Sequence, residues 1–365
     1  MKKLFIMSHG LSANGIDTFV SNIVKGLDKC KYDITVVIAV DEDNTQLREA
    51  EVCAAGAKVF RTCDLGSIKR MWVHSKKLLQ LLKTNKPDIF HSNMDLLNGL
   101  NLLVAWLAGV PIRVSHSHTT SSQYEKKTGK HLIVSIYRGL MKILCTMFSN
   151  RRCGCSEAAM KYLYGKRWQN KKHCCLVSNG IDTSRFTVSE RPSHMDGEWM
   201  IVTVGRISPV KNPLFAISII EALYQIRQDF KYLWVGNGEL IGEVQSIIAE
   251  KRLQTCVNLL GARGDVDKIL SHCHVFLLPS LFEGLPISLI EAQAAGLPCV
   301  ISDTITREID CGGCCFESLE MPASHWAQVI SDLLDGKYSY EIDVQKLERF
   351  DTSYTVKQLD AIYED

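Results

Sequence analysis

The stretch FLLPSLFEGLPISLIEAQAAG, residues 276–296, contains a strand, a loop and a helix in direct succession. The apolar run Val275–Leu278 is typical of a buried parallel strand. Pro286 stands where the first turn of a helix accepts a proline, and Gly296 marks the end of that helix. The segment therefore predicts one strand–loop–helix unit of a parallel α/β sheet.

Two carboxylates belong to this unit. Glu283 lies in the loop, and Glu291 lies a turn or more into the helix. Taken alone, the pair could be a helix cap and a solvated side chain. A helix N-terminus, however, favours an anion, because its backbone N–H groups and its dipole point at the site. A phosphate-binding site beside two carboxylates that accept hydrogen bonds from hydroxyl groups would fit a nucleotide-sugar.

The string EGLPISLIEAQAAGLPCV resembles the E-x7-E signature of retaining glycosyltransferases of family 4, which have the GT-B fold. The resemblance implies an α/β chain of two Rossmann-like, doubly wound parallel-sheet domains facing a central cleft. It also implies that Glu291 holds ribose hydroxyls and that Glu283 holds hydroxyls of the sugar. The loop residues Gly284, Leu285 and Pro286 would bind substrate, with N–H groups near Leu285 at the diphosphate.

Strands and helices alternate along the whole chain, which indicates parallel sheets. The expected strands are 3–8, 32–40, 57–62, 87–92, 112–117, 152–156, 174–177, 200–204, 230–235, 257–260, 275–278 and 298–302. We expect an acceptor-binding domain over 1–190 and a nucleotide-sugar-binding domain over 191–349, joined by a polar linker at 189–197. The last helix, at about 350–365, is expected to pack back on the first domain.

Two basic residues follow the first strand of the second domain. Arg206 and Lys211, in GRISPVKN, stand between a strand end and a helix start, where two fixed cations suit a diphosphate. The pattern GR-x4-KN resembles the family's diphosphate clamp. By the same resemblance, Arg263 and Gly264 of the GARGDV loop would meet the nucleobase.

Candidate residues of the first domain follow its first and fifth strands. Asn14 and Gly15 stand in a loop that allows close approach of backbone to a ligand, and the family places a diphosphate contact there. His116 and His118 end the strand 112–117, on one face of it. Such a histidine can donate to a sugar hydroxyl or receive its proton. The family pattern favours His118 over His116 as the catalytic residue.

Composition limits the alternatives. The 365 residues include 14 cysteines and carry a net charge of +2. No apolar run reaches the ~20 residues of a membrane span, so we expect reduced thiols in the cytoplasm. Cys311, Cys314 and Cys315 lack a second pair that would complete a zinc site. Asp41–Asp43 looks like a D-x-D metal motif but stands in an ordinary polar loop. We therefore expect no metal and no cofactor.

A basic segment occupies residues 125–172, with twelve Lys plus Arg against two acidic residues. Within it, 133–148 is apolar nearly all round. Two interpretations stay open: a helix buried on all sides, and a surface helix that touches anionic lipid. The second would place the protein peripherally on the inner face of the cell membrane.

The resemblance implies a metal-independent, retaining hexosyltransferase that moves a sugar from a nucleotide-sugar, with UDP favoured, to a lipid-linked or glycan acceptor of cell-surface polysaccharide. Two further classes remain: a nucleotide-sugar epimerase of the same fold and a non-catalytic nucleotide-sugar-binding protein. A nicotinamide oxidoreductase is disfavoured, since no G-x-G-x-x-G follows the first strand. No nucleic-acid partner is expected.

Overall fold

The computed structural model describes residues 1–12, 14–119, 131–186 and 198–364, and the chain divides into two compact units. Unit 1 comprises Met1–Gly180 and Thr352–Asp365, and unit 2 comprises Ile181–Asp351. Unit 2 thus begins before the expected boundary at 190. The reason is local, since the Ile181 N–H donates to the Phe350 carbonyl at 2.8 Å and Ile181 bridges Asp351. The expected linker at 189–197 lies outside the described residues.

Unit 1 is organised around a seven-stranded parallel sheet in the order β3-β2-β1-β4-β5-β6-β7. Its strands are β1 (Lys2–Ser8), β2 (Tyr32–Ile38), β3 (Lys58–Arg61), β4 (Ile89–Ser92), β5 (Ile112–Ser117), β6 (Arg151–Gly154) and β7 (Cys174–Leu176). Its helices are α1 (Gly15–Gly26), α2 (Glu49–Ala54), α3 (Ile68–Asn85), η1 (Asp95–Leu97), α4 (Asn98–Leu107), α5 (His131–Phe148), α6 (Glu157–Tyr164), η3 (Trp168–Asn170) and α13 (Thr352–Glu364). The strand order reverses beside β1, so this is a doubly wound sheet.

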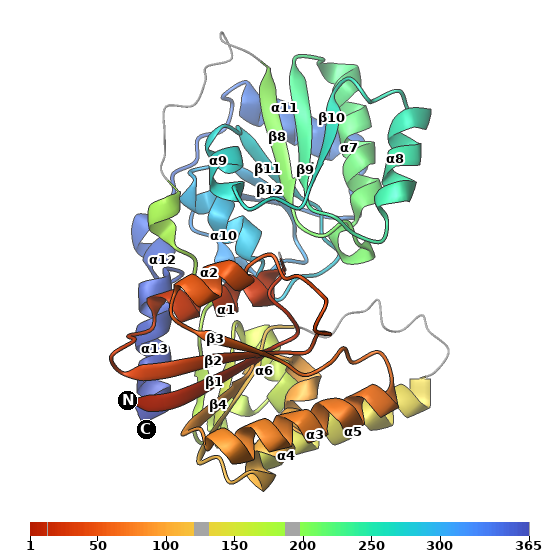
Figure 1. Cartoon of the computed structure of the whole chain (residues 1–365). Coiled ribbons are helices and arrows are strands. Elements are labelled where there is room, and N and C mark those ends of the chain that lie inside the picture. The colour runs from red at the N-terminus through yellow and green to blue at the C-terminus, as the bar shows by residue number, and fades with distance from the viewer. Residues whose placement is uncertain (13, 120–130, 187–197, 365) are drawn as a thin grey trace. The chain divides into compact units, whose positions relative to one another are not determined.

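Unit 2 repeats the plan with six parallel strands in the order β10-β9-β8-β11-β12-β13. Its strands are β8 (Trp199–Val204), β9 (Phe230–Val235), β10 (Val257–Gly261), β11 (Val275–Leu278), β12 (Cys299–Ser302) and β13 (Cys314–Glu317). Its helices are η4 (Thr183–Arg185), η6 (Pro209–Lys211), α7 (Pro213–Ile226), α8 (Ile241–Glu250), α9 (Val266–Ser271), α10 (Ile287–Ala294), η7 (Arg307–Ile309), α11 (Ala323–Leu334) and α12 (Val344–Glu348). Figure 1 shows each sheet with the helices of its own unit.

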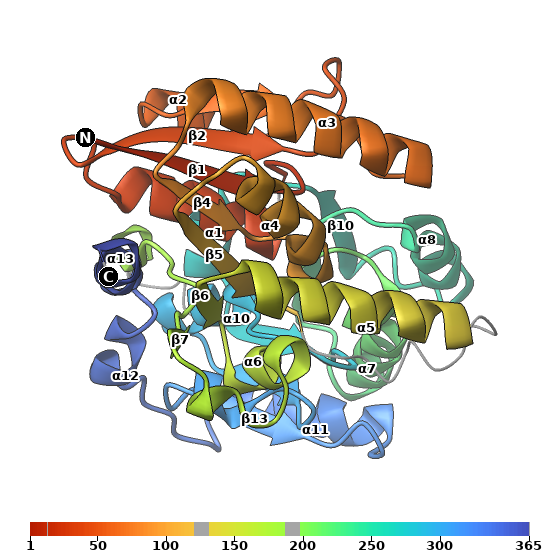
Figure 2. The same ribbon diagram turned by 90° about the horizontal axis from the view of Figure 1, so that it is seen from below.

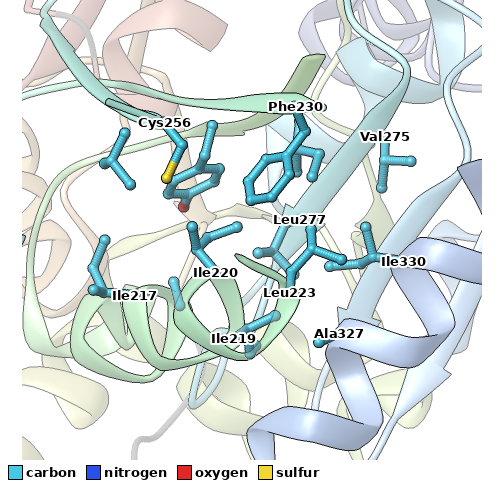
Figure 3. Packing of buried hydrophobic residues seen from close by; sticks show 14 of the residues in the cluster. Ile217, Ile219, Ile220, Leu223, Phe230, Cys256, Val275, Leu277, Ala327 and Ile330 are labelled. Atoms are coloured by element: carbon cyan, nitrogen blue, oxygen red, sulfur yellow. The ribbon is translucent and has the colours of Figure 1, made fainter. Parts of the chain in front are cut away.

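The core of unit 2 lies between its sheet and the helices α7 and α11. Figure 3 shows Ile217, Ile220 and Leu223 of α7 facing side chains of the sheet such as Phe230 and Leu277, all fully buried. Burying each such side chain stabilises the fold by about 1.5–3 kcal/mol. This packing fixes the strand ends from which the candidate site residues project.

The C-terminal helix α13 belongs to unit 1, where it packs against α1. The two helices approach so closely that a Cβ on Gly26 would lie 2.8 Å from a methyl of Val356. At the other end of α13, Tyr363 is fully buried. The chain therefore returns to its first unit after completing the second.

Helix α5 is not buried on all sides. One face packs on α4, where Gly99 leaves room for the backbone of Met141, and Cys145 is fully buried. The opposite face is exposed, with Ile136 and Met147 at 63% and 66% exposure. The interpretation of 133–148 as an all-round buried helix is therefore wrong. Among the described residues, no helix is long and apolar enough to cross a membrane.

Candidate active site

The predicted cations of unit 2 stand between β8 and α7. Arg206 follows β8 in the loop, and Lys211 ends the short helix η6. Asn212 then adopts φ +52°, a left-handed conformation that turns the chain into α7 at Pro213. Both basic side chains therefore lie at the carboxyl edge of the sheet, where open α/β sheets bind ligands.

The structure brings Lys211 and Glu283 together. The Lys211 ammonium lies 2.6 Å from Glu283 Oε1, and the two side chains are 14% and 13% exposed. The Ser280 hydroxyl donates to the same carboxylate oxygen at 2.8 Å. The loops carrying the pair are also joined by a 2.8 Å bond from the Leu281 N–H to the Val210 carbonyl. Ser280 was not identified from the sequence.

The loop Gly236–Gly238, called the glycine loop from here on, packs against the segment that carries Arg206. The Ile207 N–H donates to the Asn237 carbonyl at 3.0 Å, and the Trp234 indole N–H donates to the Gly205 carbonyl at 2.8 Å. Gly236 has φ +143°, and a Cβ there would lie 2.1 Å from the Gly205 oxygen. The string Gly236-Asn237-Gly238 after β9 has two glycines, which allow either a turn or a close approach of the backbone to a ligand. In the structure it supports the β8 loop.

Arg206 differs from Lys211 in its surroundings. Its side chain is 69% exposed, and its Nε lies 3.1 Å from Glu239, which follows the glycine loop. Exposed ion pairs of this kind contribute little to stability. The guanidinium is therefore held near the β8 edge by a contact that a stronger anion can replace.

The second carboxylate of the E-x7-E pattern is set on α10. This helix begins at Ile287, with Pro286 as its N-cap residue, so the proline precedes the first helical position where we expected it. Leu285 and Pro286 are buried, and Gly284 and Glu291 are half-buried. Glu283 in the loop and Glu291 one turn into the helix thus flank the start of α10.

Arg263 and Gly264 follow β10 and are exposed. Arg263 forms a two-pronged contact with Asp265, with distances of 2.8 Å and 2.6 Å. This contact lowers the pKa of the Asp265 carboxyl. The pair fixes the side chain of Arg263 along its own loop and leaves the backbone of Gly264 uncovered, with nothing within 4 Å of a Cβ placed there.

In unit 1, Asn14 caps α1. Its Oδ1 accepts from the Asp17 N–H at 2.9 Å, and its Nδ2 donates to the Asp17 carboxylate at 2.7 Å. Gly15 is the first helical residue and is exposed. The Asn14 side chain thus stabilises the start of α1. The N–H groups of the first helical turn lie at the edge of the sheet, where the sequence predicts a phosphate contact.

His118 lies at the end of β5 and is 7% exposed. Its Nδ1 is 3.1 Å from Asn179 Oδ1, and its Nε2 is 3.0 Å from Asn93 Oδ1. Burial lowers the pKa of His118, opposed by the nearby Asp95 carboxylate and the Asn179 bond. Both ring nitrogens are thus engaged in hydrogen-bond contacts. Asn93 and Asn179 were missed, although both stand in polar strings that end strands, HSN and SNG.

Two more histidines lie behind His118. His91 Nε2 is 3.1 Å from His116 Nδ1, and His91 Nδ1 is 2.6 Å from the Tyr363 hydroxyl of α13. The His116 ring stacks on His118 with centroids 4.2 Å apart. Burial lowers the pKa of His91 to about 3 and that of His116 well below its usual value. His116 is fully buried, whereas His118 is slightly exposed. Of the two histidines, His118 therefore lies at the edge of the site and His116 lies beneath it.

Asp95 is a further polar residue at this edge that sequence analysis missed. It adopts φ +50° at the start of η1. Its carboxylate accepts from the His118 N–H at 2.7 Å, from the Thr119 N–H at 3.0 Å and from the Thr119 hydroxyl at 2.6 Å. A strained aspartate held by three hydrogen bonds fixes the ends of β4 and β5 relative to each other.

In the described part of the chain, no group of three His, Cys, Asp or Glu side chains is placed so that it could hold a metal ion. Cys311 is buried, with its Sγ directed at the Ile309 carbonyl at 3.7 Å. Asp41, of the D-x-D-like string, pairs with Arg70 of α3. These residues therefore have structural partners of their own.

Comparisons with known proteins show which family the chain is similar to. Residues 13–185 match the family described as Glycosyltransferase Family 4, and residues 184–308 match Glycosyl transferases group 1. EpsF of Bacillus subtilis, named as a glycosyltransferase, is 29% identical over 341 residues, covering 90% of this chain and 87% of EpsF. An Escherichia coli UDP-Gal:alpha-D-GlcNAc-diphosphoundecaprenol alpha-1,3-galactosyltransferase is 28% identical over 62% of this chain and 60% of its own length.

Solved structures share the fold at lower identity. HepE of Anabaena, in complex with UDP-glucose, superposes with a TM-score of 0.77 at 17% identity and covers 99% of both chains. Sucrose-phosphate synthase of Thermosynechococcus elongatus superposes with a TM-score of 0.76 at 14% identity, over 100% of this chain and 98% of that one. The two parallel-sheet units, the E-x7-E loop at the β11–α10 junction and these matches lead to one assignment: the chain belongs to the family 4 glycosyltransferases and has the GT-B fold.

Proposed function

We propose that this glycosyltransferase moves a sugar from a UDP-sugar to a lipid-linked or glycan acceptor in cell-surface polysaccharide synthesis, with retention of configuration and without a metal ion. The observation that carries the proposal is the shielded Lys211–Glu283 pair at the carboxyl edge of the unit 2 sheet. It sets a fixed cation and an acidic side chain side by side, as binding of a diphosphate and its attached sugar requires.

The cations would stabilise the leaving group. An ammonium has three donors, and Glu283 occupies one of those of Lys211. The remaining donors, the guanidinium of Arg206 and N–H groups near Leu285 would receive the diphosphate oxygens. Negative charge grows there as the glycosidic bond breaks, so these groups bind the transition state more tightly than the substrate. Protein cations thereby take over the task that a metal ion performs elsewhere.

Each carboxylate would orient a different part of the donor. Glu283, held by Lys211 and Ser280, would accept hydrogen bonds from sugar hydroxyls. Glu291, half-buried on α10, would accept those of the ribose, and the backbone around Arg263 and Gly264 would meet the base. Neither carboxylate acts as nucleophile. For retention, the acceptor oxygen attacks on the face that the phosphate leaves, and its proton passes to the departing phosphate oxygen.

Unit 1 would bind the acceptor and would also contribute contacts to the donor diphosphate. His118 lies at the end of β5 with both ring nitrogens held by Asn93 and Asn179, so a sugar hydroxyl would replace one of these two contacts to reach the ring. The N–H groups around Asn14 and Gly15 would approach the diphosphate. We further propose that the enzyme acts at the inner face of the membrane, with the basic segment 125–172 toward it; residues 120–130 lie outside the described part.

Names of relatives support the donor and acceptor classes. The Escherichia coli relative is named for a UDP-sugar donor and a diphosphoundecaprenol acceptor. A Campylobacter jejuni relative, 25% identical over 80% of this chain and 77% of its own length, is named an N,N'-diacetylbacillosaminyl-diphospho-undecaprenol alpha-1,3-N-acetylgalactosaminyltransferase. CapH of Staphylococcus aureus, 27% identical over 79% of both chains, is named a capsular polysaccharide biosynthesis glycosyltransferase.

A panel of UDP-, GDP- and ADP-sugars tests the proposal, scored by thermal shift and by release of the nucleotide with and without polyprenyl-diphosphate sugar acceptors. We expect a UDP-sugar to stabilise the protein and acceptor to raise UDP release. Release of a free epimeric sugar without acceptor would instead identify an epimerase, and binding without turnover would identify a non-catalytic binding protein.

A further inference from the structure

The outer surface of α4 and α5 carries a strip of exposed apolar side chains. Its members are Ile136, Leu140, Ile143 and Met147 of α5, with exposures of 63%, 50%, 55% and 66%, and Trp106 and Leu107 of α4, with 51% and 54%. The spacing of four, three and four residues places the α5 members on one face of the helix. We call these six residues the α4–α5 face.

The two helices join into one surface. They run side by side in unit 1, as Figure 2 shows, and the Trp106 ring lies 5.2 Å from that of Phe148, next to Met147. Single exposed apolar residues are common on proteins, but a contiguous group of this size marks a binding surface. The strip belongs to a well-packed helix, because Met141 and Cys145 on the inner side of α5 are buried.

Cations border this face. A groove between α5 and α6 is lined by Ile143 and Met147 together with Lys142, Lys161 and Lys166. The Lys142 ammonium lies 4.0 Å from the centre of the Tyr162 ring. From His131 to Lys172 the sequence has nine basic residues and a single acidic one, Glu157. Apolar residues and positive charge thus meet on one side of unit 1.

We propose that the α4–α5 face and the lysines of its groove form a docking surface for an anionic phospholipid bilayer. The apolar side chains would enter the boundary between headgroups and acyl chains, while the lysines would contact lipid phosphates. A second copy of this chain is disfavoured as the occupant, because a two-fold contact through α5 would bring like charges together. This deepens the proposed function, since a lipid-linked acceptor presents its diphosphate at such a bilayer surface.

Co-sedimentation of the full chain with phosphatidylcholine vesicles, with and without phosphatidylglycerol, tests the surface. We expect binding that needs phosphatidylglycerol and weakens with added salt. Leu140→Glu/Ile143→Glu should reduce binding by at least ~10-fold, because the two charges oppose insertion. The matched control is Ile68→Glu/Ile226→Glu, which changes two apolar residues of 87% and 46% exposure outside the face.

The charge contribution is tested separately. Lys166→Glu should weaken binding to the anionic vesicles by roughly five-fold or more, since one lysine near such a surface contributes about that factor. Lys357→Glu, an exposed position of α13, should leave binding unchanged. Circular dichroism and UDP binding, both measured without vesicles, show that each variant is folded.

Three results would overturn the proposal: no binding of the wild type to anionic vesicles, equal binding of the Leu140→Glu/Ile143→Glu variant, or a dimer in light scattering that this variant dissolves. The last would assign the face to a second copy. A protein that binds vesicles but no nucleotide would refute the proposed transferase chemistry alone. One that binds UDP but no vesicle would refute the docking surface alone.

Discussion

At the scale of single residues, the site of unit 2 depends on how one ion pair is shielded. Lys211 and Glu283 are largely withdrawn from water, and breaking a shielded pair leaves an uncompensated charge. The pair therefore holds the ammonium in place before any ligand arrives. Preorganised charge of this kind needs no rearrangement when the leaving group becomes negative.

Gly236 is predicted to be indispensable for the shape of the β8 loop. Gly236 has a positive φ of +143°, which alanine rarely adopts, and a Cβ there would lie 2.1 Å from the Gly205 oxygen. Gly236→Ala should therefore lower the free energy of unfolding by more than about 1 kcal/mol. Urea denaturation measures the change. The control Gly242→Ala lies in α8 with nothing within 4 Å of its Cβ, and should be neutral or slightly stabilising. Equal effects of both substitutions would contradict the role of the glycine loop.

At the scale of elements, α13 is attached to the unit 1 sheet through Tyr363 and His91. Tyr363→Phe leaves a buried histidine nitrogen without its hydroxyl partner, and should cost about 1–3 kcal/mol of unfolding free energy. Thermal and urea denaturation check this. Tyr354→Phe, on the same helix but 45% exposed, should change stability by less than ~0.5 kcal/mol. If the two variants lose the same stability, the Tyr363–His91 bond does not anchor the helix.

The buried histidines predict a pH dependence of stability. Burial lowers the pKa values of His91, His116 and His118 below the unfolded value of about 6.5. The unfolded chain therefore takes up protons that the folded chain does not, and stability falls as pH drops below about 6.5, by up to ~1.4 kcal/mol per pH unit for each histidine. Urea midpoints between pH 7.5 and 5.5 measure this, and His91→Gln should flatten the slope. Constant stability over that range would show that the histidines protonate in the folded state.

Sequence patterning was most informative where strands are long and apolar. All twelve expected strands occur in the structure. They could be predicted because short apolar runs such as Phe276–Leu278 are typical of buried parallel strands. β13 and α12 were missed: CCFE after two glycines lacks a recognisable period, and a helix of five residues is too short to show one. The burial of α5 stayed open between two interpretations, because apolar residues all round a helix do not reveal whether one side lacks a neighbour.

The candidate site shows a similar limit. The E-x7-E spacing and GR-x4-KN identified Glu283 and Lys211, but only the structure shows that they touch. The partners of His118 and His91 could not be inferred, because Asn93, Asn179 and Tyr363 come from three distant segments. Contacts between such segments depend on the packing of the whole unit and leave no local periodicity.

At the scale of the whole molecule, we predict that transfer does not depend on a divalent cation. Lys211, Arg206 and the start of α10 would supply the positive charge at the diphosphate, so excess chelator should leave turnover of the UDP-sugar within about two-fold. The measurement is UDP release with acceptor, before and after EDTA. Loss of activity that manganese restores would return attention to Asp41–Asp43 as a metal site.

The most direct test of the central claim is the turnover of Lys211→Ala together with its affinity for UDP. We predict a loss of turnover of at least ~100-fold and a Kd for UDP raised by roughly ten-fold or more. The control Lys251→Ala removes another paired lysine of unit 2, whose partner is Glu221, and should alter neither value. Unchanged turnover and affinity in a folded Lys211→Ala protein would contradict the account, since the donor diphosphate would then be held elsewhere.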